Sequence, residues 1–164
     1  MANTPAMALF EVLVRHGVPF VVIGGHAVNF HGYIRATEDH DIIFQRSPDS
    51  EAALLLALQE LNAAWISDEI DPTTGLERLV PVTPSYVRHQ HLMMLHTDAG
   101  YLDVFDHIPG FPHEPVARLF DSAEQLHGIH YVSLQWLRRM KAASGRPRDL
   151  DDLENLPGIE QEGR

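Results

Sequence analysis

Two aspartates that stand two residues apart are the first candidates for chemistry in this sequence. Asp39 and Asp41 open the segment DHDIIF, whose β-branched and apolar residues predict a strand. Because side chains i and i+2 of a strand point to the same face, both carboxylates are expected to enter one space. Two anions so placed repel each other unless a cation lies between them. The spacing therefore predicts a site for Mg²⁺ or Mn²⁺, which keep open positions for water and phosphate oxygens.

A glycine pair ends the apolar segment PFVVIGG, which precedes the two aspartates. The apolar run predicts a buried strand. Where such a strand ends at Gly24 and Gly25 and a helix begins, free backbone N–H groups can approach a phosphate closely because no Cβ intervenes. A glycine pair alone usually marks a turn, and this one matches neither the Rossmann nor the P-loop pattern. Its value as a signal comes from its position beside the paired acids.

A third carboxylate lies in the segment GYLDVFDHI. Asp103 stands inside the run YLDVF, where an ionised group is costly to bury without a cation or another partner. Phosphoryl transfer with two metal ions needs a further ligand of this kind. Asp106 would point to the opposite side of a regular strand, so it ranks below Asp103. An isolated Asp-x-Asp pair is more often a turn or a helix cap, and the convergence of the three features is what favours a metal site.

The remaining sequence predicts the elements that would position these residues. Residues 66–90 mix turn residues with short apolar runs, which fits either a mobile loop or an irregular hairpin. Elsewhere the patterns predict helices over 7–17, 26–32, 47–65, 113–126, 130–145 and 147–156, and strands over 19–25, 39–44, 91–97 and 100–108, the last two joined as an antiparallel hairpin.

This order of elements predicts an α/β (α+β) domain with a small mixed β-sheet flanked by helices. The 164 residues fit one domain, with a core over about 18–110 and C-terminal helices over about 113–157. The sequence has no cysteine, which excludes disulfides and thiolate metal sites. No segment has the apolar length of a membrane span and the N-terminus lacks a secretory signal, so we expect no membrane association and a cytoplasmic location.

The charge balance bears on the partner. With 12 Lys+Arg and 23 Asp+Glu, the net charge is −11 at pH 7, which repels polyanions over most of the surface. That weighs against a nucleic-acid-binding module without settling the substrate, because bound Mg²⁺ supplies positive charge locally. Basic residues concentrate in LRRMKAASGRPR. Lys141 either faces the site or lays its stem along the core and reaches water. Arg146 either binds phosphate or forms an ion pair with Asp149.

These residues carry a resemblance to a known superfamily. The pattern of Gly24-Gly25, then HG, then an arginine, a threonine and the paired acids, followed at a distance by Asp103, resembles the DNA polymerase β-type nucleotidyltransferases. Within them the chain resembles short stand-alone proteins related to AbiEii-type toxins, because VSLQWLRRMKAASGRPRDLDDL is similar to their basic-helix signature. It is also similar to aminoglycoside and lincosamide nucleotidyltransferases. The resemblance covers roughly residues 20–153.

The resemblance implies transfer of a nucleoside monophosphate from an NTP to an acceptor hydroxyl, with release of pyrophosphate. It also implies a role for each matching position. Gly24 and Gly25 would bind the triphosphate, Asp39 and Asp41 both metal ions, and Asp103 the catalytic ion while it activates the acceptor; Lys141 and Arg146 would neutralise the triphosphate, and Arg35 would do the same or pair structurally with an acid.

Two departures from the family pattern leave alternatives open. Many relatives have Gly-Ser where this chain has Gly24-Gly25, and larger relatives carry a more extensive C-terminal part that helps to select the acceptor. We expect a homodimer or a partner protein to supply that wall, and an RNA end, a protein or a small molecule all stay open as acceptors. One alternative function is an aminoglycoside/lincosamide-type antibiotic nucleotidyltransferase. The other is a non-catalytic nucleotide-binding or antitoxin-like partner protein, but such a protein has no physical reason to gather three unpaired carboxylates.

Overall fold

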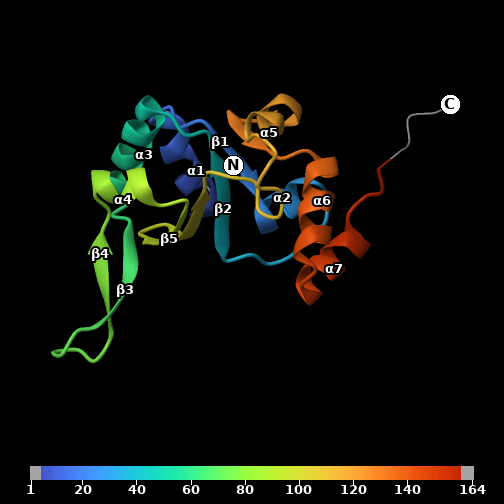
Figure 1. The fold of residues 1–164 in the computed structure, drawn as a ribbon. Coiled ribbons are helices and arrows are strands. Elements are labelled where there is room, and N and C mark those ends of the chain that lie inside the picture. Colours follow the sequence, from blue (N-terminus) through green and yellow to red (C-terminus); the bar gives the residue numbers. More distant parts are fainter. Residues whose placement is uncertain (1–4, 160–164) are drawn as a thin grey trace.

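The computed structural model describes residues 5–159, which are built around one mixed sheet of eight strands (Figure 1). The strand order is β4-β3-β5-β6-β2-β1-β8-β7. In chain order the elements are α1 (Pro5–Arg15), β1 (Phe20–Ile23), α2 (Gly24–Phe30), β2 (Asp39–Phe44), α3 (Pro48–Glu60), β3 (Ala64–Ile70), β4 (Glu77–Pro81), α4 (Pro84–His89), β5 (Leu92–Thr97), β6 (Gly100–Phe105), α5 (Ala117–Ser122), β7 (Glu124–Leu126), β8 (Ile129–Tyr131), α6 (Leu134–Ser144) and α7 (Pro147–Asn155).

The pairing of the central strands confirms the mixed sheet that the sequence predicts. β2 runs antiparallel to β1 and parallel to β6, and β5 and β6 form the expected antiparallel hairpin. Seven helices flank the sheet within the described residues. None of these helices is long and apolar enough to cross a bilayer.

One face of the sheet is covered by helices along most of its width. The side chains of β1, β2, β5 and β6 that point to this face pack with α1, α3 and α4 into one core. Phe44, Met93 and Leu102 are completely buried there. This core anchors the strands that carry the candidate acids, because the acids alternate along β2 and β6 with the buried residues.

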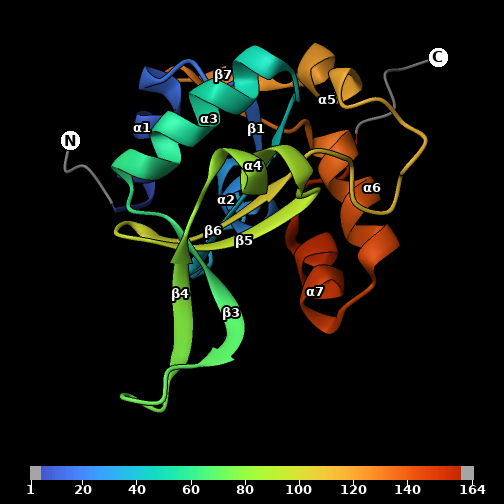
Figure 2. The ribbon, with the colours of Figure 1, turned by 60° about the vertical axis from the view of Figure 1, so that its left-hand side comes forward.

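The opposite face is covered over only part of its width. Over β1 and β2, residues such as Val21 and Ile43 pack against α2, α5 and α6, and we call this part the covered half. Over β5, β3 and β4 the large apolar side chains on this face are exposed, including Met94 at 63% and Ile66 at 49%, and we call this part the open half. The distal part of the β3–β4 hairpin stands clear of the helices in both views (Figures 1 and 2).

The strand expected over 19–25 ends at Ile23, because Gly24 and Gly25 already belong to α2, and larger differences from the predicted elements occur at two places. The helix expected over 47–65 ends at Glu60, because Asn62 adopts a left-handed backbone (φ 50°) and Ala64 already belongs to β3. Residues 66–90 form an irregular hairpin, as one of the two expectations had it, followed by the unpredicted helix α4, which Thr83 caps by accepting a hydrogen bond from the Tyr86 backbone N–H.

The second difference lies between α5 and α6. The helix expected over 113–126 is confined to Ala117–Ser122, and the helix expected from residue 130 begins at Leu134, capped by Ser133. Between them β7 and β8 form a hairpin whose two turn residues, His127 and Gly128, both have positive φ. β8 then pairs with β1 in parallel, which extends the sheet by two strands. Strands of three residues are too short to show a period in the sequence.

Candidate functional site

Asp41 and Asp103 lie side by side on neighbouring parallel strands. The register of β2 and β6 places Asp41 opposite Asp103 and Asp39 opposite Tyr101. All three acids line one pocket of about 610 Å³, between the sheet, the loop that follows α2, and the helices α6 and α7. The period of two in β2 therefore brings the predicted pair into one space, and the later strand brings Asp103 to it.

The acids perturb one another. Burial and the charges of Asp103 and Asp39 raise the pKa of Asp41 to about 7, against the weaker pull of Lys141 and Arg146. Burial and the charge of Asp39 also raise the pKa of Asp103, while a hydrogen bond with Asp41 lowers it. Burial and mutual repulsion therefore disfavour the charged forms of Asp41 and Asp103, as expected for carboxylates that share one space.

The donor set suits a magnesium ion that also binds phosphate. Mg²⁺ is usually held by one or two carboxylates together with phosphate oxygens and water, and Asp41 and Asp103 supply that number. Among residues 5–159, no group of three or more His, Cys, Asp or Glu side chains is gathered as a ready-made metal cluster. That all three acids bind metal therefore stays a prediction, and the fit rests on the Asp41–Asp103 pair.

The glycine pair is required by its neighbours. Gly24 has φ +65°, and a Cβ built there would overlap the carboxylate of Asp41. A Cβ at Gly25 would overlap the hydroxyl of Thr37 and lie 2.8 Å from its Cβ. The Thr37 side chain thus occupies the space into which a serine at position 25 would point. The departure from the Gly-Ser pattern has a local steric cause.

The predicted cations belong to a buried ionic network on α6 and α7. The Lys141 ammonium lies 3.1 Å from Asp149 and 2.9 Å from Asp152. The Arg35 guanidinium donates two hydrogen bonds to Asp152, from Nε at 2.6 Å and from Nη2 at 2.8 Å. Because Asp152 is fully buried, it holds Arg35 and Lys141 in fixed positions at the pocket wall. Sequence reasoning did not single out Asp152, although Asp149 and Asp152 share one face of a helix at i, i+3.

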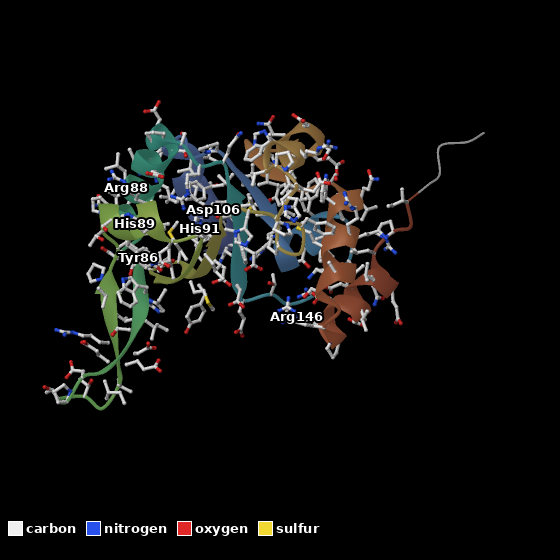
Figure 3. The ribbon with its side chains drawn as sticks, in the orientation of Figure 1. Tyr86, Arg88, His89, His91, Asp106 and Arg146 are labelled. Carbon is white, nitrogen blue, oxygen red and sulfur yellow. The ribbon has the colours of Figure 1, made fainter. Side chains whose placement is uncertain are left out.

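Arg146 lies at the edge of the same network. Its Nε donates to Asp149 at 2.8 Å, and its side chain is 74% exposed, near the junction of α6 and α7 (Figure 3). Burial alone would raise the pKa of Asp149, but hydrogen bonds from Arg146, Ser144 and Lys141 hold that pKa well below its usual range. Arg146 therefore forms the ion pair that the sequence suggested and also lines the pocket.

The pocket as a whole has nearly balanced charge. Its cations are Arg35, Lys141, Arg146 and Arg148, and its acids are Glu38, Asp39, Asp41, Asp103 and Asp149. Asp152 neutralises part of this positive charge from behind. The pocket therefore does not attract a triphosphate by its side chains alone, and a divalent cation on Asp41 and Asp103 would change the sign of its charge balance.

Asp106 and the histidines lie outside the pocket. Asp106 accepts hydrogen bonds from Arg46 and His91, at 2.9 and 2.8 Å, on the side of α4 and away from Arg146 (Figure 3). Its lower rank as a site residue fits this placement. His40 points away from the acids that flank it, donates from Nδ1 to the carbonyl oxygen of Tyr101 and stacks on His26.

Comparisons with known proteins identify the fold. No protein-family model matches the chain, and no curated protein sequence matches it. Among solved structures, the chain is similar to the antibiotic-resistance factor ANT(2'')-Ia, with a TM-score of 0.55 and 14% identity over 94% of this chain and 83% of that one. It also aligns with JHP933 from Helicobacter pylori, with a TM-score of 0.45 and 16% identity over 89% of this chain and 62% of that one. The likeness to ANT(2'')-Ia establishes a nucleotidyltransferase-like fold.

Proposed function

We propose that this chain is a metal-dependent nucleotidyltransferase that transfers a nucleoside monophosphate from an NTP to an acceptor hydroxyl and releases pyrophosphate. The observation that carries the proposal is the Asp41–Asp103 pair on β2 and β6, at a pocket whose far wall presents Lys141 and Arg146. The nucleotidyltransferase-like fold supports the same reaction. A relationship to AbiEii-type toxins, a cytoplasmic location and completion by a partner chain are further parts of the proposal, and they rest on the sequence resemblance.

The acids would have two tasks. Asp41 and Asp103 would hold Mg²⁺ or Mn²⁺, with Asp39 as a further ligand once phosphate is bound. The ion supplies charge that offsets the phosphate oxygens and draws them toward the acids. Asp103 would also accept the proton of the attacking hydroxyl, because its carboxylate lines the pocket beside Asp41, where the metal-bound phosphate would lie.

The cations on α6 and at the start of α7 would act on the other end of the nucleotide. Lys141 and Arg146 would face the negative charge that grows on the departing pyrophosphate, where fixed positive charge is most effective. Asp149 and Asp152 keep the Lys141 ammonium in place before the nucleotide arrives, so that little reorganisation is needed during the reaction. The backbone at Gly24 and Gly25 would contact the triphosphate where Cβ atoms are absent.

The test follows a label on the α-phosphate. The purified protein is incubated with each α-labelled NTP, with Mg²⁺ or Mn²⁺ and with a cell extract, and labelled products are separated into RNA, protein and small molecules. We expect labelled product with the wild type and none with Asp41→Asn. Binding of each NTP is measured in parallel by calorimetry.

Two outcomes would contradict the proposal. Transfer that persists in Asp41→Asn would remove the acid pair from the chemistry. NTP binding without transfer under any condition would favour the non-catalytic alternative, a nucleotide-binding or antitoxin-like partner protein.

A further inference from the structure

A row of apolar side chains leads across the open half to the acids. The register pairs Leu79 of β4 with Ile66 of β3, and Met94 of β5 with Asp103 of β6. Trp65 and Leu95 form the last pair between β3 and β5, and Ile66 and Met94 are the next residue on each strand, so by alternation both point to this face. Leu79, Ile66 and Met94 therefore continue the line of Asp103 and Asp41 on one face of the sheet.

The members of this row are large, apolar and exposed. Leu79 and Ile66 are each 49% exposed and Met94 is 63% exposed, while Tyr101, which lies beside Asp39, is 50% exposed. Neighbouring strands are about 4.8 Å apart, so the row extends about 14 Å from Asp103. None of these four residues lines the nucleotide pocket. They form a second surface, which meets the pocket at the acids.

The charge around the row is negative. Between Ala64 and Pro81 the chain has the acidic residues Asp68, Glu69, Asp71 and Glu77 and a single basic residue, Arg78. Arg78 itself lies 3.7 Å from Glu69, so its charge is partly neutralised. A phosphate backbone gains nothing from this surface, because RNA binding draws most of its affinity from cations at the phosphates. A positively charged, partly apolar molecule fits the charge of the hairpin.

The position of the cations indicates that the nucleotide and the acceptor approach the acids from different halves of the sheet face. Lys141 and Arg146 lie over the covered half, so the triphosphate belongs there. A hydroxyl that attacks the α-phosphorus from the side opposite the leaving pyrophosphate then arrives from the open half, over Met94. The acceptor must accordingly carry its hydroxyl next to an apolar body and, further away, positive charge.

We infer that the acceptor is a polypeptide segment with a serine, threonine or tyrosine flanked by apolar and basic residues, and that it lies along Met94, Ile66 and Leu79. An extended chain rises about 3.3 Å per residue, so four or five residues cover the row. A compact polar cation would leave most of this apolar strip without a partner. The inference rests on the proposed nucleotidyl transfer and names its substrate class.

The reaction on such a segment balances with the NTP alone. The side-chain oxygen of the peptide forms a bond to the α-phosphorus, and the bond from the α-phosphorus to the oxygen that bridges it to the β-phosphorus breaks. Pyrophosphate leaves with the electron pair of that bond, and Asp103 takes the proton of the hydroxyl. The product is a phosphodiester between the peptide side chain and the nucleoside.

The experiment compares acceptors and open-half variants under one set of conditions. The acceptors are a positional-scanning peptide library with a fixed central serine, threonine or tyrosine, total tRNA, and an aminoglycoside, each with α-labelled NTP and Mg²⁺. The proteins are the wild type, Met94→Gln, which adds no charge beside Asp103, Ile66→Lys and the control Leu56→Lys, which changes an apolar residue of α3 that is 55% exposed. Calorimetry measures NTP binding by each protein.

We expect the wild type to label peptides, with enrichment of basic and apolar residues near the hydroxyl. Met94→Gln and Ile66→Lys should each lower peptide labelling roughly tenfold, with NTP affinity unchanged, whereas Leu56→Lys should keep both. Labelling of tRNA or the aminoglycoside in place of peptides would overturn the inference. So would peptide labelling that is insensitive to Met94→Gln. NTP binding by the wild type with no acceptor labelled, or no NTP binding at all, would instead refute the proposed function, on which the inference depends.

Discussion

The covered and open halves of one sheet face have the same alternating strand pattern but differ in what covers their side chains. In both halves, alternate side chains of β-strands point to this face. In the covered half these side chains pack under α6, and the helix brings Lys141 to the acids. In the open half large apolar side chains such as Met94 stay exposed. The acids lie at the boundary, where a buried charged wall meets an uncovered apolar strip.

The difference indicates which half can be changed without loss of the fold. The wall of the covered half depends on charges that are buried together, so removing one member leaves the others without compensation. The open half contributes little burial, so its residues are free to serve recognition.

The largest effect is expected at Asp152 in the covered half. Asp152→Ala removes the shared partner of Arg35 and Lys141, and breaking a buried ion pair from one side typically costs about 3–5 kcal/mol. Urea denaturation measures the change in the free energy of unfolding. Glu154→Ala, an exposed position on the same helix, should stay within about 0.5 kcal/mol. Equal effects of the two substitutions would show that the network does not stabilise the wall.

The two adjacent methionines of β5 test the open half directly. Met93 is completely buried in the core under α1 and α3, whereas Met94 is 63% exposed on the other face. Met93→Ala should lower the free energy of unfolding by about 2–5 kcal/mol, and Met94→Ala should change it by less than about 0.5 kcal/mol. Thermal or urea unfolding of both variants measures the difference. A large loss in Met94→Ala would mean that another chain or segment covers the open half.

The acids at this boundary could be predicted from the sequence, because the patterns that identify them are local. The alternation in DHDIIF placed Asp39 and Asp41 on one face, and a helix was expected where α6 carries Lys141. The origin of the buried wall could not be predicted, because the pairing of Arg35 with Asp152 joins residues 117 positions apart. The β7–β8 hairpin was missed because each strand has three residues and gains its stability from β1.

A smaller effect is expected at Gly25, where the loop after α2 packs on the helix. Gly25→Ala places a methyl group against Thr37, 2.8 Å from its Cβ, and such overpacking typically costs about 1–3 kcal/mol. Thr37→Gly removes the obstacle, so the double variant should lose less stability than the sum of the two single changes. Gly158→Ala is the matched control, since no atom lies within 4 Å of its added Cβ. Additive losses would show that Thr37 does not restrict position 25.

The effect of the Asp41 charge depends on pH, and its sign reverses the usual result of mutating a buried residue. The pKa of Asp41 is raised to about 7 in the fold, so the folded state binds a proton more tightly than the unfolded state and loses stability as the pH rises from the unfolded pKa to about 7. Asparagine never ionises. Asp41→Asn should therefore stay close to the wild type near pH 4 and exceed it by about 3–4 kcal/mol at pH 8 without divalent cations. Thermal unfolding across this pH range measures the difference, with the exposed Asp121→Asn as control. Added Mg²⁺ should stabilise the wild type and leave Asp41→Asn unchanged. A variant that is less stable than the wild type at pH 8 would mean that the acid pair holds the fold together and that its repulsion is not available to bind a cation.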